Sequence, residues 1–243
     1  EWYREEISNV KEKMEEHFDV RVTDEALEEA IITGNETQRL QRRLYELRGS
    51  SAPPITGSQS LSVLVAESSM PKDDYNRLLQ ALIEELEAGE GVSGFDHRLM
   101  VSGSVIDNPA MLKIIEDTGG LVVSDTLCFG ARRSFREPIR EDGDPLDALA
   151  ECYYKQIQCP RMFDSYPERF ESAMELARQA NVDGVILQSI RNCDLHGIDN
   201  VMLEKDFEGR GIPVLVLERE YDALADTGRI KTRVQAFLER IGA

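Results

Sequence analysis

The sequence predicts an α/β fold: a doubly wound, mostly parallel sheet with helices on both faces, preceded by a short helical segment. Two observations support this prediction. Five apolar runs are too short for helices and are bounded by polar, Gly or Pro residues, which is typical of buried strands. Segments with helical periodicity separate most of these runs, so the connections are βα crossovers and the strands are mostly parallel. The five runs cover residues 61–65, 98–101, 121–124, 184–187 and 214–217.

The first 57 of the 243 residues predict helices only. Apolar residues near the helical period in 1–16 indicate a solvated helix with one buried stripe, Thr23 caps a second helix, and 35–48 continues as another. The stretch GSSAPPITG that follows contains two prolines and two glycines, which break regular structure. We interpret residues 1–57 as a helical segment, the connection from an N-terminal domain, and residues 58–243 as the α/β domain.

Helices are expected between the strands of the second part. Leucines recur at helical spacing in the first of these helices, Pro109 starts the second, and Asp144 with Pro145 opens the third. The expected helices cover residues 73–88, 109–117, 144–155, 167–180, 199–208 and 229–241.

The helix over residues 35–48 carries the only strongly basic patch in the chain. It contains Arg39, Arg42, Arg43 and Arg48. Such a patch can meet a phosphate or an acidic partner, but exposed arginines are also ordinary on helices. The sequence leaves both interpretations open.

Composition excludes several classes of protein. A formal net charge of −18 argues against a nucleic-acid partner, because binding to phosphates requires a basic surface. No stretch of eighteen apolar residues and no signal peptide is present, so we expect no membrane association. Four cysteines are too few for a disulfide scaffold in a chain of this length. A reducing, cytoplasmic location is therefore expected.

Common catalytic motifs are absent from the sequence. It contains no GxGxxG after a first strand, no GxxxxGK followed by Ser or Thr, no HExxH and no GxSxG. These absences leave nucleotide-binding loops, zinc hydrolases and serine esterases without support. The remaining candidates for chemistry are thiols.

Two cysteines follow the carboxyl ends of separate predicted strands. Cys128 comes after 121–124 and Cys193 after 184–187, and ligands of open α/β sheets collect at that edge. Cys159 lies between two helices, before a proline, whereas Cys152 lies within a helix and is interpreted as a small buried hydrophobe. Thiolates gathered at one edge are suited to iron–sulfur ligation, although the spacing alone is not specific.

Other strand-end residues have two interpretations each. The turn at residues 102–104 can bring a ligand close to backbone amides or can be an ordinary loop. Asp125 and Glu218 can act as acid or base, or can cap the following helix. His196 can donate a proton near a cluster at Cys193, or can have no chemical role.

Several segments together resemble one family of enzymes. They are LYELRGSSAPPITGSQSL, AESSMPKDDYNRLL, RLMVSGSVIDNPAMLKIIEDTGGLVVSDTLCFGAR, VDGVILQSIRNCD, GIPVLVLEREYD and TGRIKTRVQAFLE. In this order they resemble the carboxyl-side portion of the 2-hydroxyacyl-CoA dehydratase and benzoyl-CoA reductase family, which includes double-cubane cluster relatives. The resemblance extends from about Leu27 to Leu238.

The resemblance implies an iron–sulfur subunit that receives low-potential single electrons from an ATP-dependent activator. The family fold implies two related α/β domains around a 4Fe-4S cluster, or a double-cubane 8Fe-9S cluster, with a homologous subunit in a homo- or heterodimer. The implied reaction is reductive chemistry on an acyl-CoA thioester, in which one added electron gives a ketyl radical anion. Cys193 matches the family's clearest ligand, Cys128 matches a cysteine of the reductase-like and double-cubane branches, and Cys159 matches a cysteine–proline segment. Further ligands are expected in an N-terminal portion.

Three functions therefore remain open. The first is a dehydratase or benzoyl-CoA reductase-like enzyme, and the second is a double-cubane reductase for small unreactive substrates. The third is a non-catalytic subunit that holds a cluster-bearing partner in place. A cluster-free α/β domain with structural thiols is the plainest alternative.

Overall fold

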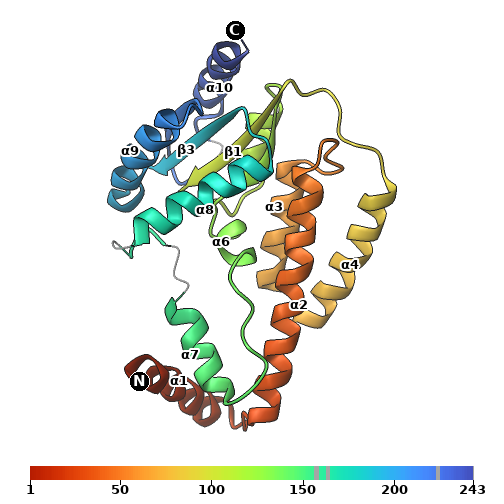
Figure 1. The fold of residues 1–243 in the computed structure, drawn as a ribbon, viewed down its shortest axis with the longest axis vertical. Coiled ribbons are helices and arrows are strands. Elements are labelled where there is room, and N and C mark those ends of the chain that lie inside the picture. Colours follow the sequence, from red (N-terminus) through yellow and green to blue (C-terminus); the bar gives the residue numbers. More distant parts are fainter. Residues whose placement is uncertain (156–158, 163–164, 223–224, 243) are drawn as a thin grey trace.

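The computed structural model describes residues 1–155, 159–162, 165–222 and 225–242, and it contains the predicted α/β fold (Figure 1). Its sheet has four parallel strands in the order β2-β1-β3-β4. The bounds are β1 His97–Gly103, β2 Gly120–Asp125, β3 Gly184–Ile190 and β4 Val214–Arg219. β2 is buried along its whole length, as expected for a parallel strand that is covered on both faces.

Helices cover both faces of the sheet. One face packs against α5 (Ala110–Glu116) and α10 (Thr227–Ile241), and the other against α8 (Tyr166–Gln179) and α9 (Asp194–Gly209). Alternation along the strands separates the two cores. In β3, Val185 and Leu187 belong to one core and Ile186 to the other. The doubly wound prediction is thus confirmed.

The helical part at the amino-terminal side is longer than predicted. It comprises α1 (Trp2–Phe18), α2 (Asp24–Gly49), α3 (Gly57–Ala66) and α4 (Lys72–Ala88), with the short 3-10 helix η1 (Glu67–Ser69) between the last two. The two helices predicted after Thr23 are one continuous helix, α2. Thr23 caps it as expected, and Gly34 lies in its interior without ending it. A single glycine costs a helix only about 1 kcal/mol, which packing can offset.

The prediction of a strand at residues 61–65 was wrong, because this segment belongs to α3. Thr56 and Gln59 form a capping box at its start. The first two backbone N–H groups of α3, those of Gly57 and Ser58, donate hydrogen bonds to the carboxylate of Glu116. The two most buried apolar residues of α3, Leu61 and Leu64, are three positions apart, which is the spacing of one helix face. The described sheet therefore has four strands where the sequence predicted five.

The remaining elements agree closely with the prediction, with two differences. α7 covers Pro145–Lys155, close to the predicted range. The first difference is a short helix, α6 (Ala131–Ser134), which was not predicted. α9 begins at Asp194 and not at residue 199, so Cys193 is its N-cap residue. This difference brings the thiol directly to the start of a helix.

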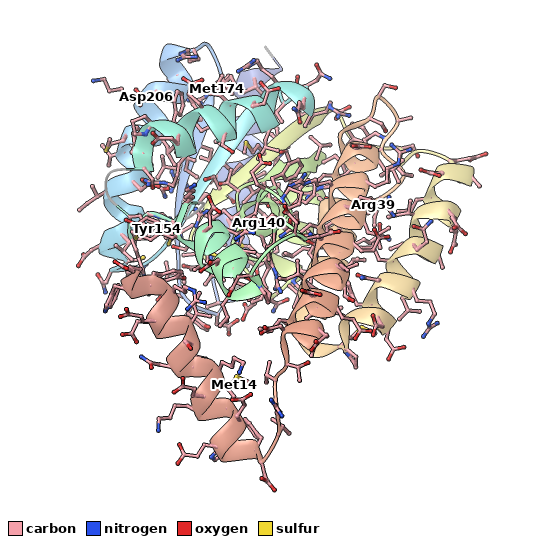
Figure 2. All side chains as sticks on the ribbon, turned by 60° about the horizontal axis from the view of Figure 1, so that its bottom comes forward. Met14, Arg39, Arg140, Tyr154, Met174 and Asp206 are labelled. Carbon is pink, nitrogen blue, oxygen red and sulfur yellow. The ribbon has the colours of Figure 1, made fainter. Side chains whose placement is uncertain are left out.

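Helix α1 lies away from the sheet. None of its residues is buried, so the predicted buried stripe is wrong for this chain as described. It contacts α7, and Arg4 pairs with Asp147 in α7 and, at 3.1 Å, with Asp144 directly before it. Figure 2 shows α1 extending from the rest of the molecule, with Met14 on its outer half. No helix in the described part of the chain is long and apolar enough to cross a membrane.

Candidate functional site

The carboxyl ends of all four strands lie at one edge of the sheet, because every strand pair is parallel. β1 is followed in sequence by β2 on one side, whereas β3 lies on its other side. The order therefore reverses at β1 and β3, and ligands of such sheets bind in the crevice outside this switch point. The turns that carry Cys128 and Cys193 follow β2 and β3, so both leave the sheet at this edge, on either side of β1.

Cys193 is half-buried and occupies the N-cap position of α9. Its N–H donates to the carbonyl of Ile190 at 3.0 Å, and its own carbonyl accepts from Gly197 at 2.8 Å. Asn192 before it has φ 63°, a left-handed conformation that Asn adopts more readily than most residues. The thiol is thus held at the amino-terminal end of a helix.

Cys128 lies in the turn between β2 and α6 and is exposed to solvent. Arg132, one helical turn further along, donates from Nη1 to its Sγ at 3.6 Å. Both turn cysteines are thus at least partly accessible to solvent at this edge.

Asp125, the last residue of β2, is buried and caps the Cys128 turn. Its Oδ1 accepts hydrogen bonds from the N–H groups of Leu127 at 3.1 Å and Ala131 at 3.0 Å. Its Oδ2 accepts from the hydroxyl of Tyr45 and from Nη1 of Arg48, each at 2.7 Å. Burial and the neighbouring carboxylate raise the pKa of Tyr45 well above its usual value, so the hydroxyl remains a donor. The capping interpretation of Asp125 is confirmed.

The arginine patch of α2 is engaged within the protein. Arg39 pairs with Glu36 at 2.7 Å, and Arg43 pairs with Glu87 at 2.6 Å. Arg42 donates to backbone carbonyls at and just after the end of α6, and Arg48 is fully buried. The prediction that Arg48 belongs to a surface patch was wrong, because this side chain points inward to the end of β2.

Ends of the other strands are joined by a second buried network. Gly103 has φ 118°, and a Cβ at this position would lie closer than 3.0 Å to the carbonyl oxygen of Gln188 in β3. Ser104 donates its N–H to the same oxygen at 3.0 Å. Arg219 at the end of β4 donates Nε to Oε1 of Gln188 at 2.8 Å and Nη2 to the carbonyl of Val105 at 2.6 Å. The prediction of a turn at residues 102–104 was therefore wrong for its first two residues, which end β1 and pair with β3, and only Ser104 lies beyond the strand.

A small crevice lies beside this edge, between α6, α8 and α9. It is lined among others by Ser102, Thr126, Arg132, Arg169 and Asp199. The hydroxyl of Thr126 donates to that of Ser102 at 2.6 Å, and Arg169 forms a largely buried ion pair with Asp199. The crevice thus contains cationic and hydroxyl groups close to the Cys128 turn.

His196 is buried on α9, one turn after Cys193. Burial and, to a lesser extent, the charges of Arg132 and Arg169 lower its pKa to about 4. Its Nδ1 has no hydrogen-bond partner among the described residues. A neutral imidazole at pH 7 carries no extra proton, so this geometry gives no support to a role as proton donor. Glu218, the other strand-end carboxylate, is exposed and pairs with Arg191 at 2.8 Å.

The other two cysteines lie in different surroundings. Cys152 is buried in α7 within a small apolar cluster, and burial raises its pKa, so the hydrophobic interpretation is confirmed. Cys159 is half-buried in the short described stretch 159–162, where its carbonyl accepts from Met162 at 2.8 Å. Over the described ranges, no three His, Cys, Asp or Glu side chains come together as a metal-binding group. The edge, as far as the structure describes it, thus presents two thiol-bearing turns and no complete ligand set.

These features define an open parallel α/β protein with thiols in the loops at its carboxyl edge. The family model described as 2-hydroxyglutaryl-CoA dehydratase, D-component, matches residues 1–241, and the chain belongs to this family. The predicted resemblance is confirmed.

Several named relatives are similar over most of this chain. The (R)-phenyllactyl-CoA dehydratase beta subunit of Clostridium sporogenes is 26% identical over 95% of it. The beta subunit of (R)-2-hydroxyglutaryl-CoA dehydratase from Acidaminococcus fermentans is 28% identical over 96%. A benzoyl-CoA reductase subunit of Thauera aromatica is 22% identical over 88%. The chain spans 61%, 62% and 56% of the length of these three relatives, respectively.

Proposed function

We propose that this chain is the iron–sulfur subunit of a 2-hydroxyacyl-CoA dehydratase or benzoyl-CoA reductase-like enzyme. Its family membership supports the reaction class, because relatives are named as dehydratase subunits and as a benzoyl-CoA reductase subunit. In this proposal the substrate is an acyl-CoA thioester, and an ATP-dependent iron–sulfur activator supplies single electrons. The enzyme is completed by a homologous subunit.

The observation that carries the proposal is the placement of two thiols in loops on either side of β1. Cys193 and Cys128 would hold the 4Fe-4S cluster, with Cys159 as a third ligand from this chain. Soft thiolates are the usual ligands of such clusters, and the helix N-terminus and Arg132 would offset part of their negative charge. When bound, the cluster would supply electrons at low potential. The residues of this chain would hold it at the sheet edge and contribute N–H groups around the sulfurs.

A cysteine series tests the cluster assignment directly. The protein is reconstituted anaerobically with iron and sulfide, and bound iron, acid-labile sulfide and the electron paramagnetic resonance spectrum of the reduced state are measured. Cys193→Ala should lose most of the bound iron, because a thiolate ligand is removed. Cys128→Ala and Cys159→Ala should lower the iron content or alter the spectrum.

Cys152→Ala is the matched control, since this thiol is buried in an apolar cluster of α7. It should retain the iron content and spectrum of the wild type. Equal iron binding by Cys193→Ala and the wild type would refute the ligand assignment. Reconstitution is done with the chain alone and with a homologous subunit present, because the described residues contain no complete ligand set.

A further inference from the structure

We propose that Asp125 is the positioning residue for Cys128: its buried carboxylate fixes the turn that presents this thiol at the sheet edge. The role of the Cys128 thiol as a ligand rests on the proposed cluster function. The hydrogen bonds by which Asp125 holds the turn do not depend on that function. Asp125 is 1% exposed and is the last residue of β2, whereas Cys128 is exposed three residues later.

The two oxygens of Asp125 have separate roles. Oδ1 accepts the N–H groups of Leu127 and Ala131, which lie on either side of Cys128 in the sequence. Both ends of the turn are therefore bound to one atom. Oδ2 accepts the hydroxyl of Tyr45 and Nη1 of Arg48, and both of these residues come from α2. The long helix thereby fixes the direction of the carboxylate, and the carboxylate fixes the turn.

Close packing leaves the carboxylate little freedom. A Cβ on Gly130 would lie closer than 3.0 Å to Asp125 Oδ1, and 2.7 Å from the hydroxyl oxygen of Tyr45. Arg48 also donates Nε to the carbonyl of Val122 at 3.0 Å, so the same guanidinium holds the strand that leads into the turn. Glycine is the only residue that fits at position 130 without displacing these groups.

An amide cannot replace the carboxylate in this network. All four groups that reach Asp125 are donors, and an ionised carboxylate accepts on both oxygens. Asn offers one acceptor oxygen and one NH2 group, so one pair of donors would face another donor. Removal of the negative charge would also leave Arg48 buried without its ion partner, which is strongly destabilising. A milder change is therefore needed for a clear test.

Tyr45→Phe supplies this milder change, because it removes one hydrogen bond to Asp125 and keeps the ring and the ion pair. Tyr75→Phe is the matched control. Tyr75 is also buried, at 3% exposed, and its hydroxyl accepts from Gln41 at 3.3 Å, away from Asp125. Gly130→Ala is a second perturbation, which displaces the carboxylate by contact.

The readout is the rate at which iodoacetamide alkylates Cys128, divided by the rate for Cys193 in the same iron-free protein, both measured by mass spectrometry. Loss of one hydrogen bond should change this ratio about fivefold in Tyr45→Phe. Gly130→Ala should change the ratio by at least as large a factor. Tyr75→Phe should leave it unchanged. General destabilisation would mainly raise the rate of the half-buried Cys193, so the free energy of unfolding of each variant is also measured, and the ratios are compared under conditions in which every variant is folded.

An unchanged ratio in both Tyr45→Phe and Gly130→Ala would overturn the proposal. A changed ratio supports it, and reconstituted Tyr45→Phe should then show an altered cluster spectrum with iron still bound. Iron binding by the wild type is measured separately. If the wild type binds no iron while the ratio still changes, the cluster function fails and the positioning of the thiol by Asp125 stands.

Discussion

Substitution of Arg219 by methionine should destabilise the protein more than loss of any exposed arginine. Arg219 is 4% exposed and donates to four oxygens: Gln188 Oε1 and the carbonyls of Val105, Glu220 and Tyr221. It thereby connects the carboxyl end of β3 with the loops that follow β1 and β4. Methionine fills a similar volume with a flexible apolar chain and donates nothing, so these oxygens lose their shared partner.

The expected loss of stability depends on which of the four oxygen acceptors water cannot reach once the guanidinium is removed. Gln188 is fully buried, and leaving its Oε1 unpaired costs about 1–3 kcal/mol. The three carbonyls belong to partly exposed loop residues, so water replaces part of what they lose and together they add about 1–2 kcal/mol. Burial lowers the pKa of Arg219, because the charged guanidinium is desolvated. This desolvation offsets part of the stabilisation that its hydrogen bonds provide. We therefore expect a loss of about 3 kcal/mol, with a decrease of the melting temperature by about 6–12 °C for a chain of this size.

Urea unfolding, followed by circular dichroism at 222 nm, gives the free energy of unfolding for each variant. Arg178→Met is the control, because this arginine is 60% exposed and pairs only along α8 with Glu175, at 2.9 Å, among the described residues. It should change stability by no more than about 0.5 kcal/mol. A loss below about 1 kcal/mol in Arg219→Met would show that water can replace the guanidinium at this edge, and would refute the reasoning.

Three further predictions concern pH and backbone packing. The pKa of His196 is about 4 in the folded protein and 6.5 when unfolded, so the unfolded chain binds more protons between these values and stability should fall as the pH is lowered from 6.5 to 4. The full decrease is about 3 kcal/mol, and urea midpoints of His196→Gln should depend less on pH than those of the wild type. Gly103→Ala should cost more than about 3 kcal/mol or prevent folding, because its Cβ would meet the carbonyl of Gln188 at a positive φ. Gly34→Ala, with nothing within 4 Å, should instead stabilise α2 by about 0.5–1 kcal/mol in the same urea assay.

The parallel sheet was predictable because its strands are short, continuous apolar runs with buried surroundings on both faces. Residues 61–65 have the same composition, and an apolar run of five residues does not separate a strand from one face of a helix. The capping box of Thr56 and Gln59 was the signal that distinguished them, since a helix start directly precedes the run. This local signal indicates a helix over residues 57–66 and so leaves four strands for the sheet.

Long-range burial of charge could not be predicted from local patterns. Arg48 follows other arginines on a charged helix, and only the distant Asp125, 77 residues later, makes its burial possible. Arg219 similarly depends on groups in the loops after β1 and in β3. Sequence patterns report how polar a position is and which neighbours it has nearby, whereas the partner that stabilises a buried charge can lie anywhere in the chain.

Buried arginines explain how an acidic chain keeps its carboxyl edge ordered. Arg48 binds the turn after β2 through Asp125, and Arg219 binds the turns after β1 and β4. An arginine stays protonated over the whole physiological range and donates in a fixed planar geometry, so these contacts hold without any titration near pH 7. Thiols on loops need such support if they are to bind a metal as proposed, because a loop free to move would spread its sulfur over many positions. The order of this edge therefore depends on cations inside the fold, although the chain as a whole carries a net charge of −18.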